Sequence, residues 1–576
     1  MKDVIFLQKR KSIQRFWQLS KGYWNAEHKW RVRGLLAFVI GLNFFDVYLL
    51  VQLNSWYNAF YNALQQYQVD EFWPLIGQFT ALAMLHIVIA VYAIYLRQMV
   101  QINWRTWLTN HYLGQWLSEQ VYYRLQVLKS DMDNPDQRIS EDINQFVSLT
   151  LQLLIGFLKQ LTTLVAFGVV LWNLSGAFTV PVGSHEFVIY GYMFWFSLAY
   201  SAIGTVCAHL VGRKLISLNF EQQRFEADFR FNMMRVRENS ESVAFYRGEQ
   251  PENVGFHERF ARVVNNFWQL MRQTKILNFY VNGYGQLGII VPLILAAPKY
   301  FAGAMALGGL MQTVSAFGRV QDALSYFVDS YDTIAQLAAV VRRLSTFTEH
   351  MQEVASIENG VHRREAAAAE LTLDNLEVRL PDGRTLLEDC TLQLPQGSHA
   401  LVTGASGCGK STLLRTLAGI WPYGKGELKL PADSRVLFLP QRPYLPLGSL
   451  RRALYYPLSA SGSEEQLQNV LRQVGLEKFI ERLDAVDDWS RILSLGEQQR
   501  LAFARVLLVR PDWIFLDEAT SALDEPREQQ MYELLRSSLP ESSIVSVGHR
   551  STLFAQHEQE LHLTGNGSWQ LRPIAG

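Results

Sequence analysis

The chain has 576 residues, too many for one ordinary hydrophobic core, so we expect at least two domains. Apolar residues make up 49% and aromatic residues 12% of it, yet mean hydropathy is near zero, which indicates an apolar half joined to a soluble half. Its 53 basic and 53 acidic residues cancel, which argues against nucleic acid as a partner. Three scattered cysteines argue against a disulfide framework and a zinc site.

Stretches of about 20 mostly apolar residues, the length that crosses a bilayer, predict a bundle of six membrane-spanning helices within residues 1–350. The predicted spans are 34–53, 72–96, 149–171, 187–211, 279–301 and 302–327. Arg319 and Asp322 interrupt the sixth span. The polar, alanine-rich segment 351–370 is predicted to be a connector, and residues 371–576 read as an α/β domain of short strands and helices.

Loop charges predict the orientation of these helices. Residues 1–33 carry nine Lys or Arg, 97–145 carry five and 212–275 carry eleven, whereas 54–71 and 173–186 carry none. This alternation follows the positive-inside rule, so we expect a multi-pass protein with both termini cytoplasmic. It also argues against a soluble domain of buried helices. The two long cytoplasmic stretches keep helical periodicity, which predicts that the spanning helices continue beyond the membrane.

Three ionisable residues, Asp46, His86 and Lys159, fall inside the predicted spans. Such groups are costly in a membrane and usually face a cavity or one another. Two interpretations stay open: a site that lines the solute pathway or handles protons, and a purely structural pairing.

A phosphate-binding pattern, G-x-x-x-x-G-K-[ST], occurs between an apolar strand and a predicted helix. It consists of Gly404, Ala405, Ser406, Gly407, Cys408, Gly409, Lys410, Ser411 and Thr412. Glycines let backbone amides turn toward phosphates, and the following helix N-terminus favours negative charge. We therefore predict ATP as cofactor, with Lys410 at the β- and γ-phosphates and Ser411 at Mg²⁺. The position of Cys408, near Lys410 and a helix N-terminus, also predicts a reactive thiol.

Two carboxylates, Asp517 and Glu518, end a second apolar strand that begins at Trp513. A buried strand thus delivers both acids to its carboxyl end. Asp517 is expected to support Mg²⁺ through water, and Glu518 to polarise the attacking water as general base.

The remainder of this half resembles the ATP-binding-cassette family over 371–576. Leu493–Arg500 is similar to the family's signature sequence, and the resemblance implies that Ser494 and Gly496 bind the γ-phosphate held by the opposite subunit. It implies that Gln441 senses Mg²⁺ and the membrane domain, and that His549 is the switch histidine at the γ-phosphate. Ser521–Asp524 resembles the loop that contacts the partner domain.

Three positions depart from the family pattern. Leu495 replaces the first glycine of the signature and Glu497 replaces its glutamine. Leucine disfavours the positive φ that glycine allows, so we expect an altered signature backbone and a weaker nucleotide contact. Leu380 stands where the family often has an aromatic residue, which predicts poor stacking on adenine.

The membrane half resembles the SbmA/BacA and YddA group of transporters, which is akin to the peroxisomal fatty-acyl transporters. The similar stretches are Gln52–Leu64, Trp104–Tyr123, Asn134–Ile139 and Glu241–Glu249. The resemblance implies an exporter-type fold that works as a homodimer. It also implies that Asp136–Asp142 and Glu241–Glu249 dock on the ATPase domains.

These observations predict an ATP-driven transporter of an organic solute, peptide-, cobalamin- or acyl-like, in the inner membrane of a bacterium. The expected partners are a second copy of the chain, membrane lipid and the solute. An alternative is a cassette that only gates a channel or receptor. A cassette ATPase acting on ribosomes or DNA fits poorly, because it would lack the apolar helices and carry basic clusters. The sequence reveals neither the solute nor the direction of transport.

Overall fold

A computed structural model of the chain describes residues 2–26, 29–128, 134–182, 185–366, 369–458 and 462–574. Its contacts divide the chain into two compact units. The first comprises Met1–Gly114 and Asn134–Thr348, and the second comprises Gln115–Asp133 and Glu349–Gly576.

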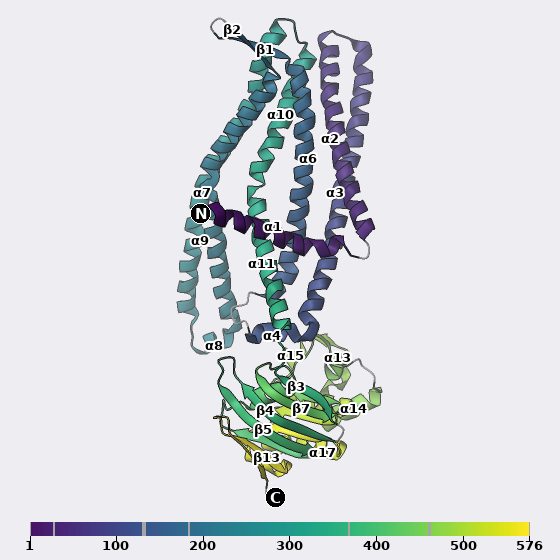
Figure 1. Cartoon of the computed structure of the whole chain (residues 1–576), viewed down its shortest axis with the longest axis vertical. Helices are drawn as coiled ribbons and strands as arrows, with labels where there is room; N and C mark the ends of the chain where they lie inside the picture. The colour runs from purple at the N-terminus through teal and green to yellow at the C-terminus, as the bar shows by residue number, and fades with distance from the viewer. Residues whose placement is uncertain are drawn as a thin grey trace. The chain divides into compact units, whose positions relative to one another are not determined.

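The first unit is a bundle of long helices with one small hairpin (Figure 1). Its elements are α1 (Lys2–Trp24), α2 (Lys29–Gln65), α3 (Val69–Leu117), α5 (Pro135–Gln137), the π-helix η2 (Arg138–Asp142), α6 (Ile143–Ser175), β1 (Ala177–Val182), β2 (His185–Tyr190), α7 (Tyr192–Glu238), α8 (Ser240–Phe245), α9 (Glu249–Phe301), α10 (Leu307–Asp329) and α11 (Tyr331–Ala355).

Among the described residues, five helices are long and apolar enough to cross a membrane, and they contain the first five predicted spans in whole or in part. The sixth prediction corresponds to α10, which begins five residues later than expected and is not among the five. This helix packs against α2, α6, α7 and α9, and Ala316, Phe317 and Val320 on it are fully buried. A helix surrounded by protein needs less apolar surface than one facing lipid, which explains its mixed composition.

The N-terminus of α10 is fastened to α2 by side-chain amides spaced one helical turn apart. Asn58 Nδ2 donates to Gln312 Oε1 at 2.8 Å, and Asn62 Oδ1 accepts from the Gly308 backbone N–H at 2.8 Å. A Cβ at Gly308 would lie 2.0 Å from the Asn58 carbonyl oxygen, so only glycine permits this approach. The polar residues within Gln52–Leu64 therefore cap a neighbouring helix that would otherwise present orphan amides.

The fourth predicted span, 187–211, is wrong at its start. Its first residues belong to β2, which pairs antiparallel with β1, and the helix begins only at Tyr192. The predicted continuation of the helices over 212–275 is present in the structure, where α7 runs on to Glu238 and α9 begins at Glu249.

The second unit contains two sheets covered by helices (Figure 1). Its helical elements are η1 (Ser118–Gln120), α4 (Val121–Leu128), α12 (Lys410–Leu417), α13 (Leu450–Tyr455), α14 (Glu464–Gln473), η3 (Glu477–Arg482), α15 (Trp489–Ile492), α16 (Leu495–Val509), α17 (Glu525–Ser538) and η4 (Ser551–Gln556). Its strands are β3 (Val361–Ala366), β4 (Glu370–Arg379), β5 (Thr385–Pro395), β6 (His399–Gly404), β7 (Gly424–Pro431), β8 (Val436–Leu439), β9 (Gly448–Ser449), β10 (Val486–Asp487), β11 (Trp513–Asp517), β12 (Ser543–Val547), β13 (Gln559–Leu563) and β14 (Trp569–Pro573).

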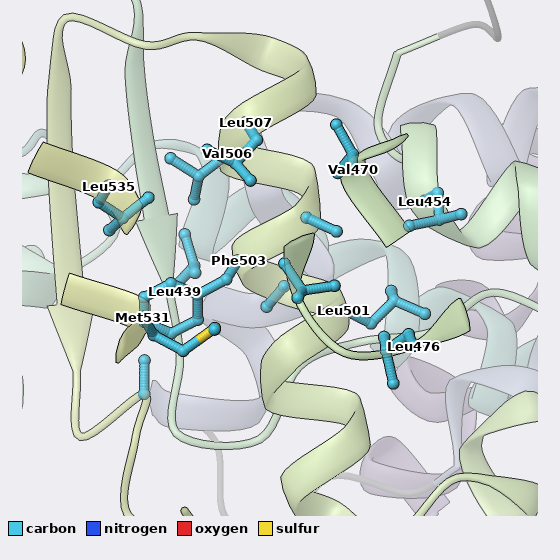
Figure 2. Close-up of a cluster of buried hydrophobic side chains, with 14 of the residues drawn as sticks. Leu439, Leu454, Val470, Leu476, Leu501, Phe503, Val506, Leu507, Met531 and Leu535 are labelled. Carbon is cyan, nitrogen blue, oxygen red and sulfur yellow. The ribbon is translucent and has the colours of Figure 1, made fainter. Parts of the chain in front are cut away.

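The larger sheet has the order β14-β13-β6-β12-β11-β8, in which every pair is parallel except β13 with β14. The smaller sheet has the order β3-β7-β4-β5, and β9 and β10 form a short pair of their own. Along β11, Ile514 and Leu516 join the apolar cluster of Figure 2, while Trp513 and Phe515 join the cluster on the opposite face. This alternation explains why the strand is apolar without interruption, since both of its faces are covered.

The expected connector 351–370 is largely structured. α11 continues to Ala355, and β3 pairs in parallel with β7. The basic and acidic residues of β3 concealed it, because strand β3 lies at a sheet edge and its side chains are mostly exposed.

Helix α4 belongs to the second unit and contacts the cassette there. Within the second unit, Arg124 on α4 is 8% exposed and donates to the carbonyl of Ile357 at 2.9 Å and to Asn359 Oδ1 at 3.2 Å. Asn359 in turn donates to the carbonyl of Gly419 at 3.2 Å, and Val127 packs against the cassette core.

The predicted docking segment Asp136–Asp142 belongs to the first unit, and its docking on an ATPase domain stays a prediction. There, Asp142 accepts hydrogen bonds from Arg138 and from Arg343 on α11. Arg138 and Asp142 thus join η2 to α11, and α4 is a contact with the cassette that the sequence did not predict.

Candidate nucleotide site

Four neighbouring parallel strands deliver the predicted site residues to one edge of the larger sheet. β6 ends at Gly404, β11 ends at Asp517, and Gln441 and His549 follow two residues after β8 and β12. Because the carboxyl ends of parallel strands lie at the same edge, residues more than 100 positions apart meet there.

The phosphate loop has the backbone that its glycines predict. Gly404, Gly407 and Gly409 have φ values of +138°, +80° and +107°, which residues with a Cβ rarely adopt. Lys410 is 6% exposed, and its Nζ donates to the carbonyls of Gly404 at 2.9 Å and of Ala405 at 3.0 Å. α12 starts at Lys410, so its unpaired amides point into the loop.

Two oxygen ligands suited to Mg²⁺ lie together beside this loop. Ser411 Oγ donates to Asp517 Oδ1 at 2.9 Å. Burial raises the pKa of Asp517, against the hydrogen bond from Ser411, which lowers it. Mg²⁺ in phosphate sites takes one or two protein oxygens, and phosphate and water supply the others.

The Glu518 carboxylate lies close to two other predicted residues, Gln441 and His549. Gln441 Nε2 donates to Glu518 Oε2 at 3.0 Å, and His549 Nε2 lies 3.4 Å from Glu518 Oε1. Glu518 has a φ of +47°, a strained conformation for a residue with a side chain. Such strain concentrates at functional sites, where the surrounding structure enforces it.

The signature residues are not brought to this cluster. Ser494 is the N-cap of α16, and its backbone N–H and hydroxyl both contact Glu497 Oε2, at 2.8 and 2.9 Å. Within residues 369–458 and 462–574, no hydrogen bond joins Ser494 or Gly496 to the phosphate loop. The phosphate loop and the signature of one chain therefore remain separate.

Glu497, the departure from the signature glutamine, completes a capping box with Ser494 and pairs with Lys478 at 2.6 Å. Burial alone would raise the pKa of Glu497, but hydrogen bonds from Lys478 and Ser494 outweigh it and lower the pKa. Glu497 thus stays ionised and holds the start of α16.

The backbone at Leu495 is helical, and the weaker nucleotide contact expected there stays a prediction. Leu495 is the first residue of α16, and the positive-φ residues of the described chain do not include it. We therefore predict that Leu495→Gly will not relieve strain and will lower stability, by up to about 1 kcal/mol from helix propensity. Thermal unfolding of the purified chain in detergent measures this, with Leu495→Ala as control. A higher midpoint for the glycine variant would show that Leu495 is strained after all.

The prediction about Leu380 concerns base selectivity. Leu380 is half-buried against the cassette core, and its N–H donates to the carbonyl of Arg384 at 2.8 Å within a turn. An aliphatic side chain gives less stacking than an aromatic ring. We expect ATP and GTP to compete for the site with similar affinities, within about tenfold. Competition binding against a fluorescent ATP analogue tests this, and a strong preference for ATP would mean that another aromatic residue stacks on the base.

Cys408 does not lie where a reactive thiol needs to be. It is 5% exposed and belongs to the cluster beneath the smaller sheet, close to Gly404 and Gly565. A buried position limits access by alkylating reagents, so Cys408 fills space in the phosphate loop.

Asp46, His86 and Lys159 form one cluster across α2, α3 and α6. Lys159 Nζ lies 2.8 Å from Asp46 Oδ2, and His86 Nδ1 lies 2.7 Å from Asp46 Oδ1. The His86 approach lacks hydrogen-bond alignment, so the Lys159 contact is the stronger. The Asp46 side chain is 3% exposed, against 29% for His86 and 36% for Lys159. This geometry favours the pairing interpretation.

Some residues beside the site have no signal in the sequence. Gln499 is fully buried and contacts the loops of Gln441 and Ser521, whereas its neighbour Gln498 contacts only the segment before α16. Nothing in the run Glu497–Arg500 distinguishes the two glutamines.

The apolar helices, the phosphate loop and the paired carboxylates together define a membrane-embedded ATPase. Two family models match the chain: ABC transporter transmembrane region 2 over residues 19–301, and ABC transporter over residues 387–521. An uncharacterized ABC transporter ATP-binding protein of Haemophilus influenzae is 36% identical over 565 residues, covering 97% of this chain and 93% of its own.

Two further relatives are similar over nearly the whole chain. The inner membrane ABC transporter ATP-binding protein YddA of Escherichia coli (strain K12) is 35% identical over 545 residues, covering 94% of this chain and 96% of its own. The lysosomal cobalamin transporter ABCD4 of Homo sapiens is 28% identical over 602 residues, covering 98% and 96%. The chain therefore belongs to the ABC transporter family, as a half-transporter of the YddA and ABCD type.

Proposed function

We propose that two copies of this chain form the working transporter, with two ATP sites at which each phosphate loop faces the signature of the other copy. The observation that carries this proposal is the separation of the two motifs within one chain. Ser494 caps α16 and contacts Glu497, while Lys410 contacts its own loop. A complete site needs both motifs on one nucleotide, so a second copy supplies what one chain lacks.

Each side chain at the strand ends has a proposed role in hydrolysis. Lys410 leaves its own carbonyls for the β- and γ-phosphates, and the loop amides bind the phosphate oxygens. Ser411 and Asp517 hold Mg²⁺, whose charge neutralises the phosphates when it is bound. Glu518 accepts a proton from the attacking water, Gln441 orients the Glu518 carboxylate, and His549 contacts the γ-phosphate.

A mixing experiment with two variants tests the shared sites. Lys410→Ala removes the phosphate-loop cation, and Ser494→Arg blocks the signature. Either variant alone spoils both sites of a dimer. A mixed dimer keeps one intact site, built from the Lys410 of one copy and the Ser494 of the other. Differently tagged chains, trapped with vanadate and a photoreactive ATP analogue, should be labelled only in the mixture and only on the Ser494→Arg copy. Labelling of that variant by itself would contradict shared sites.

We further propose that ATP closes the two cassettes, that hydrolysis lets them separate, and that this cycle moves an organic solute. Phe245 and Tyr246 beside α8 are 79% and 86% exposed, which suits docking on the cassette of the second copy. Helix ends rich in Lys and Arg support cytoplasmic termini, and the name of the Escherichia coli relative supports a bacterial inner membrane.

The solute class is proposed from the relatives alone. The human relative's name specifies cobalamin, and peptide- and acyl-like solutes remain candidates. Reconstituted vesicles loaded with each class should show ATP- and Mg²⁺-dependent flux in one direction. Flux that runs down its gradient, with ATP needed only for opening, would instead identify a gated channel.

A further inference from the structure

The loop Ser521–Asp524, which lies between β11 and α17, is held on one side by Gln499. Gln499 Oε1 accepts from the Ala522 N–H at 3.0 Å, and its Nε2 donates to Ser521 Oγ at 3.1 Å. The same Nε2 donates to the backbone carbonyl of Gln441 at 3.0 Å. One fully buried amide on α16 thus ties this loop to the loop that carries Gln441.

Arg550 holds the same loop from the opposite side. Its Nη1 donates to the carbonyl of Leu523 at 2.7 Å, and its Nη2 donates to the carbonyl of Ser521 at 3.1 Å. Two carbonyls on one guanidinium form a rigid fork that lysine cannot reproduce. Arg550 directly follows His549 in the sequence, so its position constrains that of the histidine.

Glu528 fixes the orientation of this arginine. It is 2% exposed and lies 3.5 Å from Arg550 Nη1. Its two oxygens also accept hydrogen bonds from Thr520 Oγ1 at 2.6 Å and Thr552 Oγ1 at 2.7 Å. A buried carboxylate with every partner satisfied is a rigid support.

Both residues that contact the Glu518 carboxylate are therefore linked to one loop. Gln441 is linked through its backbone carbonyl and Gln499, and His549 through its neighbour Arg550. We propose that Gln499 and Arg550 are positioning residues that couple Ser521–Asp524 to the Glu518 site. The inference rests on the proposed role of Glu518 and on this loop facing the second copy. A shift of the loop on dimer closure then reaches Gln441 and His549 together, so that hydrolysis begins only after closure.

The test uses isosteric changes in the full-length chain, reconstituted in lipid nanodiscs. Gln499→Glu keeps the acceptor for Ala522 but replaces the donor by an oxygen facing the Gln441 carbonyl. Gln498→Glu is the matched control, because Gln498 is also buried and its Nε2 donates to two carbonyls, of Ser490 at 2.8 Å and of Leu493 at 2.9 Å. Arg550→Met removes the fork, and Arg550→Lys keeps only its charge.

We expect Gln499→Glu to lower kcat about tenfold or more relative to Gln498→Glu, with ATP affinity and thermal midpoint matching that control. Arg550→Met should do the same, and Arg550→Lys should recover part of the loss. Because both residues act through one loop, the double variant Gln499→Glu/Arg550→Met should be no slower than the worse single variant, within about threefold.

Other results would overturn the coupling. If the losses of the single variants multiply, Gln499 and Arg550 act independently and are not coupled through the loop. If Gln498→Glu loses kcat as severely as Gln499→Glu, the loss is a general effect of changing α16 and not of this contact. If Gln499→Glu does not fold, Arg550→Lys and Arg550→Met decide the question by the split between kcat and KM. Wild-type turnover in Glu518→Gln would instead refute the proposed base, while the Gln499–Arg550 coupling is still measured on the chain with Glu518.

Discussion

Glu518→Gln should bind ATP as tightly as the unmodified chain and hydrolyse it about 10²–10⁴-fold more slowly, the usual effect of removing a general base. The amide keeps the shape of the side chain. Its oxygen can still accept the hydrogen bond that Gln441 Nε2 donates to Glu518 Oε2 at 3.0 Å. It cannot accept a proton from water. Binding and hydrolysis should therefore separate cleanly in this variant.

Binding of a fluorescent ATP analogue and steady-state phosphate release measure the two effects. Glu533→Gln is a suitable control, because this exposed carboxylate lies on α17 and contacts only Gln529 on the same helix. Turnover near the normal rate in Glu518→Gln would remove Glu518 from its proposed role. Loss of ATP binding would show that the substitution damages the phosphate loop instead.

Asp46→Asn should strongly destabilise the membrane half. It leaves Lys159 without its carboxylate, and His86 without the neighbour 2.7 Å away. Breaking a buried ion pair from one side costs about 3–5 kcal/mol. The partial exposure of Lys159 and His86 places the expected loss at the lower end of that range.

The double variant Asp46→Asn/Lys159→Met decides between structure and function. It removes both charges, so stability should recover most of the loss, as when a buried pair gives way to apolar side chains. Heat inactivation in detergent reports stability, with Asp70→Asn, an exposed carboxylate at the start of α3, as control. A double variant whose loss equals the sum of the two single losses would contradict the pairing. A stable double variant without ATP-driven transport would assign the charges to the solute pathway.

Local pattern predicted which residues of the candidate nucleotide site stand at strand ends, and their roles stay predictions. An apolar strand followed by a polar residue specifies a strand end, and parallel strands bring their ends together without further information. Thus Gly404 and Asp517 could be placed at strand ends before any contact was known, whereas Gln441 and His549 were assigned through the resemblance to the cassette family. The signature was harder to predict from sequence. The family has a glycine at the position of Leu495, and its expected positive φ gave no hint that Leu495 is the first residue of a helix.

The membrane half was predicted less completely, because hydropathy reports contact with lipid and not helix packing. α10 is surrounded by other helices, so its sequence carries a weaker apolar signal. β3 resembles a polar connector because it is an exposed edge strand. The partnership of Arg124 with Ile357 and Asn359 depends on residues more than 200 positions away, which no local pattern encodes.

The contact of Arg124 with Ile357 and Asn359 has a practical consequence for the expression of the cassette as a separate fragment. A recombinant cassette that starts at Glu349 would be missing α4, and with it the apolar contact made by Val127. The Ile357 carbonyl and the Asn359 amide oxygen would lose the guanidinium donor that now covers them. Such a fragment would expose the apolar surface that Val127 now covers, and exposed apolar surface promotes aggregation. Adding α4 as a peptide, or grafting it through a short linker, is the rational way to obtain a soluble ATPase.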